Sequence, residues 1–266
     1  MNKRSRGLRL AVPGVATLAL LTAACGSSSK SSSNTTTTKA AVTGNLNVFA
    51  AASLTGAFND AKTKLTAANP GLNLTYNFGG SNALVAQIQQ GAPADVYASA
   101  DQKNMQTLVT AGLVETPVTF AKNKLQIAVA AGNPKGITSL ADLAKPGVAV
   151  VLEGQGVPAG DYTRQVLTKK GITVSPKSLE TDVKSALAKV TSGEADATVV
   201  YVTDVTAGGP KVQGVNIADA DQPDISYPIA VVKATKNHAA AQAFVDSAVS
   251  GDVQKSLEAA GFSASK

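Results

Sequence analysis

From residue 45 onward, short apolar runs alternate with stretches of helical periodicity, and this alternation restricts the fold more than any other feature. Residues 46–51 form an apolar run typical of a strand. The apolar residues that follow are spaced as on one face of a helix, which ends before Asn69-Pro70-Gly71. The same alternation predicts further strands at 72–78, 95–99, 125–130, 148–152, 197–202, 215–217 and 229–232. Strands that alternate with helices predict an α/β fold of mostly parallel sheets flanked by helices.

The length of this region predicts two lobes. Roughly 220 residues are more than one sheet comfortably holds. We expect the chain to cross between lobes near 121–125 and 227–229. Residues 45–123 and 229–266 would then form lobe 1, residues 124–228 would form lobe 2, and a ligand would bind in the cleft between them.

The first 44 residues predict a secreted protein anchored to a membrane. Four basic residues precede the apolar run 10–21, which is too short to remain as a membrane span. Small residues come directly before Cys25, which resembles a bacterial lipobox. We therefore interpret residues 1–24 as a lipoprotein signal peptide and Cys25 as the lipid-carrying residue, with a free thiol as the alternative. Residues 25–44, rich in Ser and Thr, would be a flexible tether at the outer face of the cytoplasmic membrane.

Composition excludes several classes of function. One cysteine and one histidine exclude a disulfide framework and a Cys- or His-rich metal site. The formal net charge is +6, and four positive charges lie in the first nine residues, so the rest carries 6 − 4 = +2, too little for a nucleic-acid binder. No Gly-x-Ser-x-Gly motif occurs, and His238, expected to be exposed at a helix start, is far from any serine motif. We expect neither an enzyme nor a cofactor.

Four predicted helix starts could together bind an anion. They lie at Ser53, at Ser81, at 157–160 and at 181–183. Each exposes unpaired backbone N–H groups and behaves like about half a positive charge, so four that converge could hold a small dianion without Arg or Lys. Alternatively, the serines only cap their helices, and the glycines at 79 and 80 only form a tight turn.

Several motifs resemble one known family in the same order between residues 45 and 262. They are Phe49–Thr55, Gly91–Asp101, Val157–Gly160, Asp182–Leu187, Val200-Tyr201, Tyr227–Val232 and Gly261-Phe262. Together they resemble the periplasmic molybdate-binding proteins of ABC transporters. The resemblance implies a two-lobed α/β periplasmic binding protein, type II-like, that closes on a tetrahedral oxyanion and delivers it to a membrane permease. We expect a monomer.

The resemblance also implies which residues bind the ligand: Ser53, Ser81, Ala159, Val183 and Tyr201. The serines would offer hydroxyl and N–H groups, Ala159 and Val183 their N–H groups, and Tyr201 its phenol. All would contact the oxygens of the anion and not the metal. This chain has Gly-Gly-Ser-Asn where the family often has a serine run, so a neighbour of Ser81 is an alternative; Tyr201 could instead be a core residue.

The implied donors fit the chemistry of the anion. Molybdate is fully deprotonated near neutral pH and only accepts hydrogen bonds, so a buried carboxylate would repel it. Phosphate retains a proton in part and can use such an acceptor. We expect Asp95, Asp101 and Asp182 to act as caps, which favours molybdate, tungstate or sulfate over phosphate. Molybdate is preferred to sulfate on the resemblance, and an amino-acid receptor that uses Arg164 is a further alternative.

Overall fold

The computed structural model describes residues 42–265. The predicted signal peptide, Cys25 and nearly all of the tether lie outside the described residues. Within 42–265, no helix combines the length and the apolar composition that a bilayer span requires.

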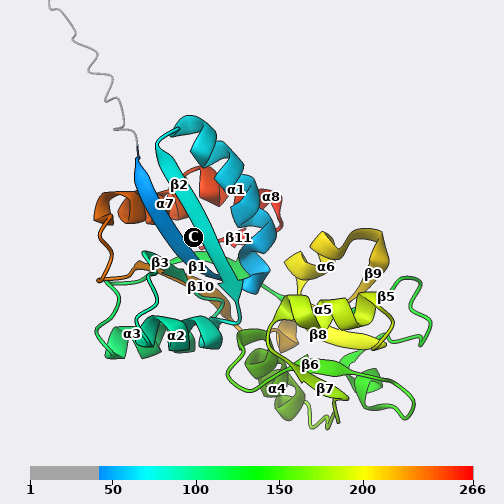
Figure 1. The fold of residues 1–266 in the computed structure, drawn as a ribbon. Coiled ribbons are helices and arrows are strands. Elements are labelled where there is room, and N and C mark those ends of the chain that lie inside the picture. Colours follow the sequence, from blue (N-terminus) through cyan, green and yellow to red (C-terminus); the bar gives the residue numbers. More distant parts are fainter. Residues whose placement is uncertain (1–41, 266) are drawn as a thin grey trace, which may run out of the picture. The chain divides into compact units, whose positions relative to one another are not determined.

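The first lobe is built on a six-stranded sheet with the strand order β11-β4-β10-β3-β1-β2 (Figure 1). The bounds are β1 Gly44–Ala51, β2 Leu72–Gly79, β3 Val96–Ala98, β4 Val118–Asn123, β10 Ile225–Val231 and β11 Ser263–Ala264. β1 pairs in parallel with β2 and β3, whereas β10 and β4 pair with their neighbours antiparallel. The sheet is therefore mixed, and the prediction of a mostly parallel sheet was wrong. Parallel neighbours such as β1, β2 and β3 need crossover connections. β10 instead enters this sheet from the second lobe and runs antiparallel to β3 and β4.

Helices cover both faces of this sheet (Figure 1). The bounds are α1 Thr55–Ala68, α2 Ser81–Gln89, α3 Gln102–Thr110, α7 His238–Ser250 and α8 Asp252–Ala259. Successive strand residues point to opposite faces. Val48 and Ala50 of β1 accordingly belong to the core cluster that contains residues of α1, α7 and α8, and Phe49 belongs to the cluster of α2 and α3. Burial on both faces explains the nearly continuous apolar sequence of β1.

The second lobe contains β5 between β8 and β9, and the parallel pair β6 and β7. A parallel bridge between Val150 and Ala197 connects the two groups of strands. β5 is antiparallel to both neighbours, so this part is also not mostly parallel. The bounds are β5 Leu125–Ala130, β6 Val151–Glu153, β7 Ser178–Glu180, β8 Ala197–Tyr201 and β9 Val212–Asn216, with helices α4 Pro158–Lys169, α5 Val183–Thr191 and α6 Val202–Gly208.

The chain passes between the two sheets at two places. Lys124 alone separates β4 from β5, within the expected first crossing. On the return, β10 joins the first sheet at Ile225, earlier than the expected residue 229. The division into residues 45–123 with 229–266 and residues 124–228 stays a prediction.

Candidate functional site

Five residues that the sequence singled out line one small cavity between the sheets. Besides these five, its lining includes residues of the loops and helix starts around it: Ala51, Ala52, Gly79, Gly80, Ala100, Val157, Pro158 and Asp182. The space open to the centre of a water molecule is about 10 Å³, and a single water needs roughly that much. The cavity is therefore compact, with room for about one water molecule.

The lining residues stand where strands end and helices begin. Ser53 lies in a 3₁₀ turn, Ala52–Leu54, directly after β1, and Ser81 is the first residue of α2. Ala159 is the second residue of α4, Val183 the first of α5, and Tyr201 the last of β8. Amides in a first helical turn have no partner within the helix. The fold thus directs the N-termini of helices from both lobes toward one cavity.

The start of α5 leaves one amide for the cavity. Asp182 caps this helix, as predicted: its Oδ1 accepts from the N–H groups of Lys184 at 2.8 Å and Ser185 at 3.0 Å. Its Oδ2 accepts from the Ser185 hydroxyl at 3.1 Å. Although Asp182 lines the cavity, its carboxylate serves its own helix. The Val183 N–H has no partner among the described residues and is free to donate.

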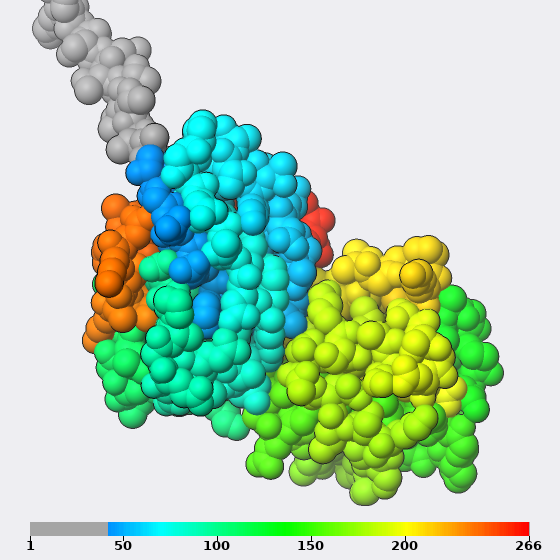
Figure 2. Space-filling model, in the orientation of Figure 1, coloured from blue at the N-terminus to red at the C-terminus, as the bar shows by residue number. Residues whose placement is uncertain are grey.

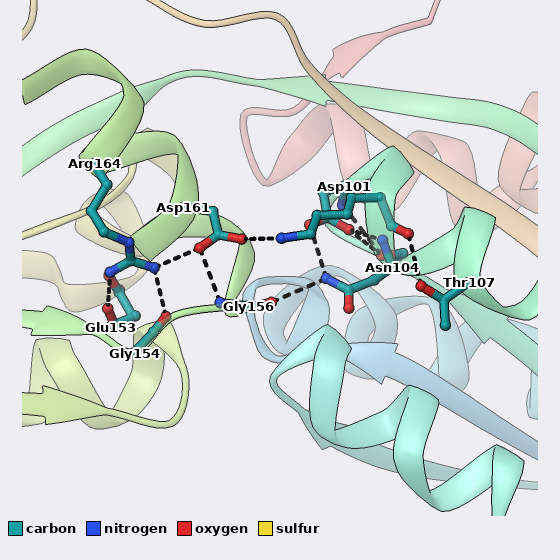
Figure 3. Close-up of polar contacts among 10 residues, drawn as sticks. Asp101, Asn104, Thr107, Glu153, Gly154, Gly156, Asp161 and Arg164 are labelled. Carbon is teal, nitrogen blue, oxygen red and sulfur yellow. Dashed lines mark hydrogen bonds and ion pairs between the residues drawn. The ribbon is translucent and has the colours of Figure 1, made fainter. Parts of the chain in front are cut away.

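The start of α4 is held in place by an arginine. Pro158 has no N–H, so Ala159 carries the first free amide of this helix. Arg164 donates to the carbonyl oxygens of Glu153 and Gly154, both at 2.8 Å, and to Oδ1 of Asp161 at 2.6 Å (Figure 3). These bonds use three of the five N–H groups of the guanidinium, and Arg164 does not line the cavity. The amino-acid receptor that would use Arg164 therefore loses its basis.

The two serines are not side-chain caps. Gly80, not Ser81, is the N-cap residue of α2, and no side chain caps that helix or the turn at Ser53. The Ser81 Oγ accepts from the Ala100 N–H at 3.1 Å, so its own hydrogen is available to the cavity. The Ser53 Oγ lies 3.0 Å from the Tyr227 Oη. The sequence did not assign Tyr227 to the site, because nothing local connects residues 174 positions apart.

The hydroxyl of Tyr201 is a buried donor without an acceptor. Tyr201 is 1% exposed, and its Oη has no hydrogen-bond partner among the described residues. Burial raises the pKa of Tyr201 well above its usual value, so the phenol is neutral and retains its hydrogen. Leaving a buried hydroxyl unpaired costs about 1–3 kcal/mol. A ligand oxygen in the cavity would remove this cost.

The other candidate residues lie outside the cavity lining. Asp101 caps α3, as expected, by accepting from the Asn104 N–H at 2.9 Å. Asp95 does not cap a helix: it accepts from the Asn47 N–H at 2.7 Å and the Thr235 hydroxyl at 2.6 Å, which ties β1 to the segment after β10. His238 is exposed at the first residue of α7. Residues 42–265 contain no group of three or more His, Cys, Asp or Glu placed to hold a metal ion.

Gly80 marks a close approach of the two lobes. A Cβ on this residue would lie 2.4 Å from the carbonyl oxygen of Thr181, in the turn before α5. Its φ of −60° and ψ of 135° suit any residue, so a tight turn does not explain the glycine. Close contact with the second lobe explains it. Figure 2 shows that the surfaces of the two lobes touch.

Comparison with known proteins agrees with this architecture. The "Molybdate-binding protein ModA" of Mycobacterium tuberculosis is 43% identical over 216 residues, which cover 81% of this chain and 83% of that protein. The protein of the same name in Escherichia coli is 35% identical over 215 residues, covering 76% and 82%. The fold also matches the periplasmic molybdate-binding protein of Azotobacter vinelandii, with a TM-score of 0.71, 22% identity, and coverage of 83% and 100%. This match confirms the predicted two-lobed α/β class.

The family model described as "Bacterial extracellular solute-binding protein" matches residues 46–263. This range includes every residue that lines the cavity and all strands except the outer ends of β1 and β11. The chain belongs to the family of bacterial extracellular solute-binding proteins.

Proposed function

We propose that this chain is the solute receptor of an ABC importer and binds molybdate, and also tungstate, in the cavity between its lobes. The ligand-binding residues would be Ser53, Ser81, Ala159, Val183 and Tyr201. The observation that carries the proposal is the Tyr201 hydroxyl, buried and without an acceptor at a cavity that residues of three first helical turns line. The names of the relatives support this choice of ligand.

The donors and the anion have complementary chemistry. A fully deprotonated dianion accepts hydrogen bonds at every oxygen, and the proposed groups can all donate. The one acid in the lining, Asp182, is already engaged by the first turn of its own helix. A partly protonated phosphate would need an acceptor that this cavity does not offer. Closure of the lobes would exchange the water shell of the anion for fixed N–H and O–H groups.

The place of action follows from the family, whose members are extracellular. We propose in addition that the chain is cleaved before Cys25, carries lipid there, acts as a monomer and passes its ligand to a permease without covalent chemistry. Mass spectrometry of membrane extracts tests the anchor. A lipid mass on Cys25 supports it, and an unmodified thiol contradicts it.

Titration calorimetry of the full chain tests the ligand. We expect tight binding of molybdate and tungstate, weaker binding of sulfate because its smaller size stretches the hydrogen bonds, and the weakest binding of phosphate. Tighter binding of phosphate than of molybdate would refute the donor-only site. Tighter binding of sulfate than of molybdate would leave the site intact but assign it to the smaller anion.

A further inference from the structure

We propose that Lys103 and Asn104, at the start of α3, form a latch that retains the bound oxyanion by fastening the first lobe to the loop before α4. Neither residue lines the cavity. They act as positioning residues, and the inference rests on the proposed function.

Two contacts make up the latch (Figure 3). The Asn104 Nδ2 donates to the carbonyl oxygen of Gly156 in the second lobe at 3.2 Å, and to Oδ2 of Asp101 in its own lobe at 2.9 Å. Asn104 is buried, so water does not compete freely for this bond. The Lys103 Nζ lies 2.9 Å from Oδ2 of Asp161, with the lysine largely exposed and the aspartate mostly covered.

The second-lobe side of the latch is continuous with the proposed binding site. The Asp161 Oδ1 accepts from the Gly156 N–H at 3.0 Å, and Arg164 joins Asp161 to the carbonyl oxygens of Glu153 and Gly154. The loop and the first turn of α4 are thus one braced unit, and Ala159 belongs to it. The contacts of Asn104 with Gly156 and of Lys103 with Asp161 therefore hold the Ala159 amide at the cavity.

Lys103 offsets a repulsion between negative charges of the two lobes. Asp101 of the first lobe lies near Asp161 of the second. Burial chiefly raises the pKa of Asp101, and the negative charge of Asp161 raises it further. At Asp161, burial acts to raise the pKa, but Arg164, the Gly156 N–H and Lys103 together hold it below its usual value. Without Lys103, Arg164 alone would pair with Asp161, and the remaining repulsion between Asp161 and Asp101 would favour separation of the lobes.

The latch predicts a specific kinetic effect. It acts once the lobes have met, so its loss should speed release of the ligand and leave association nearly unchanged. Loss of this ion pair, whose lysine is exposed, should raise the dissociation rate about two- to fivefold in Lys103→Met. Loss of the partly buried, neutral hydrogen bond to Gly156 in Asn104→Ala should raise the dissociation rate about three- to tenfold. The Lys103 effect should shrink at high salt, which a merely structural role would not produce.

The test measures molybdate dissociation from the full chain by stopped flow, together with thermal melting and the radius of gyration from small-angle X-ray scattering. Lys255→Met is the matched control, because Lys255 is equally exposed and its pair with Asp252 lies within one lobe. Faster dissociation in both latch variants, with the control unchanged, supports the latch.

Two results would overturn the inference: dissociation rates equal to wild type, or the same increase in Lys255→Met. If wild type binds no molybdate, the proposed function fails, and scattering alone decides about the latch. A larger radius of gyration in Lys103→Met and Asn104→Ala than in wild type and the control then supports it, and no difference rejects it.

Discussion

Replacing Tyr201 by phenylalanine separates a ligand-binding role from a packing role, because the two roles predict opposite signs. The substitution keeps the ring, which packs edge-on against Tyr227 with centroids 5.7 Å apart. It removes one hydroxyl that is 1% exposed and has no partner among the described residues. A hydrogen bond to a charged acceptor contributes about 1.5–3 kcal/mol. The Kd for molybdate should therefore rise about 10- to 100-fold.

Tyr201→Phe should weaken binding without lowering the thermal stability of the ligand-free protein. Since the lost hydroxyl was unpaired, the ligand-free variant should unfold at the same or a higher temperature than wild type. Tyr76→Phe is the matched control: its hydroxyl is also buried without a partner, but it does not line the cavity. Calorimetry and thermal melting of both variants give the answer. Unchanged molybdate affinity in Tyr201→Phe, or an equal loss in the control, would refute the reasoning.

Two further substitutions probe the backbone donors and the buried acid. Val183→Pro deletes the first amide of α5, at a position where proline is tolerated, and replaces the buried valine side chain by a proline ring. Molybdate affinity should fall about tenfold or more while circular dichroism stays unchanged; an unaltered titration would remove this amide from the site. Glu153 is fully buried, both its carboxyl oxygens are unpartnered, and burial raises its pKa to about 8. The folded protein therefore keeps a proton on Glu153 that the unfolded chain releases near the ordinary glutamate pKa of 4.5, and stability falls as pH rises from there to about 8. Glu153→Gln should remove this loss of unfolding free energy, which is on the order of a few kcal/mol at pH 8.5. Urea denaturation at several pH values measures it, and a variant with the same pH dependence as wild type would contradict the prediction.

Local pattern predicts the elements of this fold better than their pairing. The strand at 125–130 has the predicted bounds, because its apolar run is bordered by a lysine and a glycine-containing turn. β10 was expected only from Ile229, where the predicted apolar run begins, whereas the strand starts at Ile225 and contains Pro228. The structure accommodates this proline at a register shift between Tyr227 and Pro228. Strand direction was missed because it depends on which strand returns from the other sheet.

In the site, too, contacts between neighbouring residues are predictable from the sequence, whereas contacts between distant residues are not. The cap at Asp182 is readable from neighbouring residues and is confirmed. The bonds from Ser53 to Tyr227 and from Asn104 to Gly156 join residues 174 and 52 positions apart, and no spacing rule predicts them. Gly80 looks like a turn glycine in sequence, and only the approach of Thr181 shows why a side chain is excluded.

Three charged residues near the cavity, Asp182, Arg164 and Lys184, are engaged with other groups, and under the proposed function this decides how the site discriminates between anions. Asp182 accepts from its own helix, Arg164 donates to backbone carbonyls and Asp161, and Lys184 pairs with the buried Asp204 at 2.9 Å. A free lysine or arginine in the cavity would attract any small oxyanion, with little regard to its size. Fixed amides and hydroxyls supply comparable positive potential only at set positions. An anion that is too small or carries a proton then loses hydrogen bonds, and the cavity has no mobile charge to replace them.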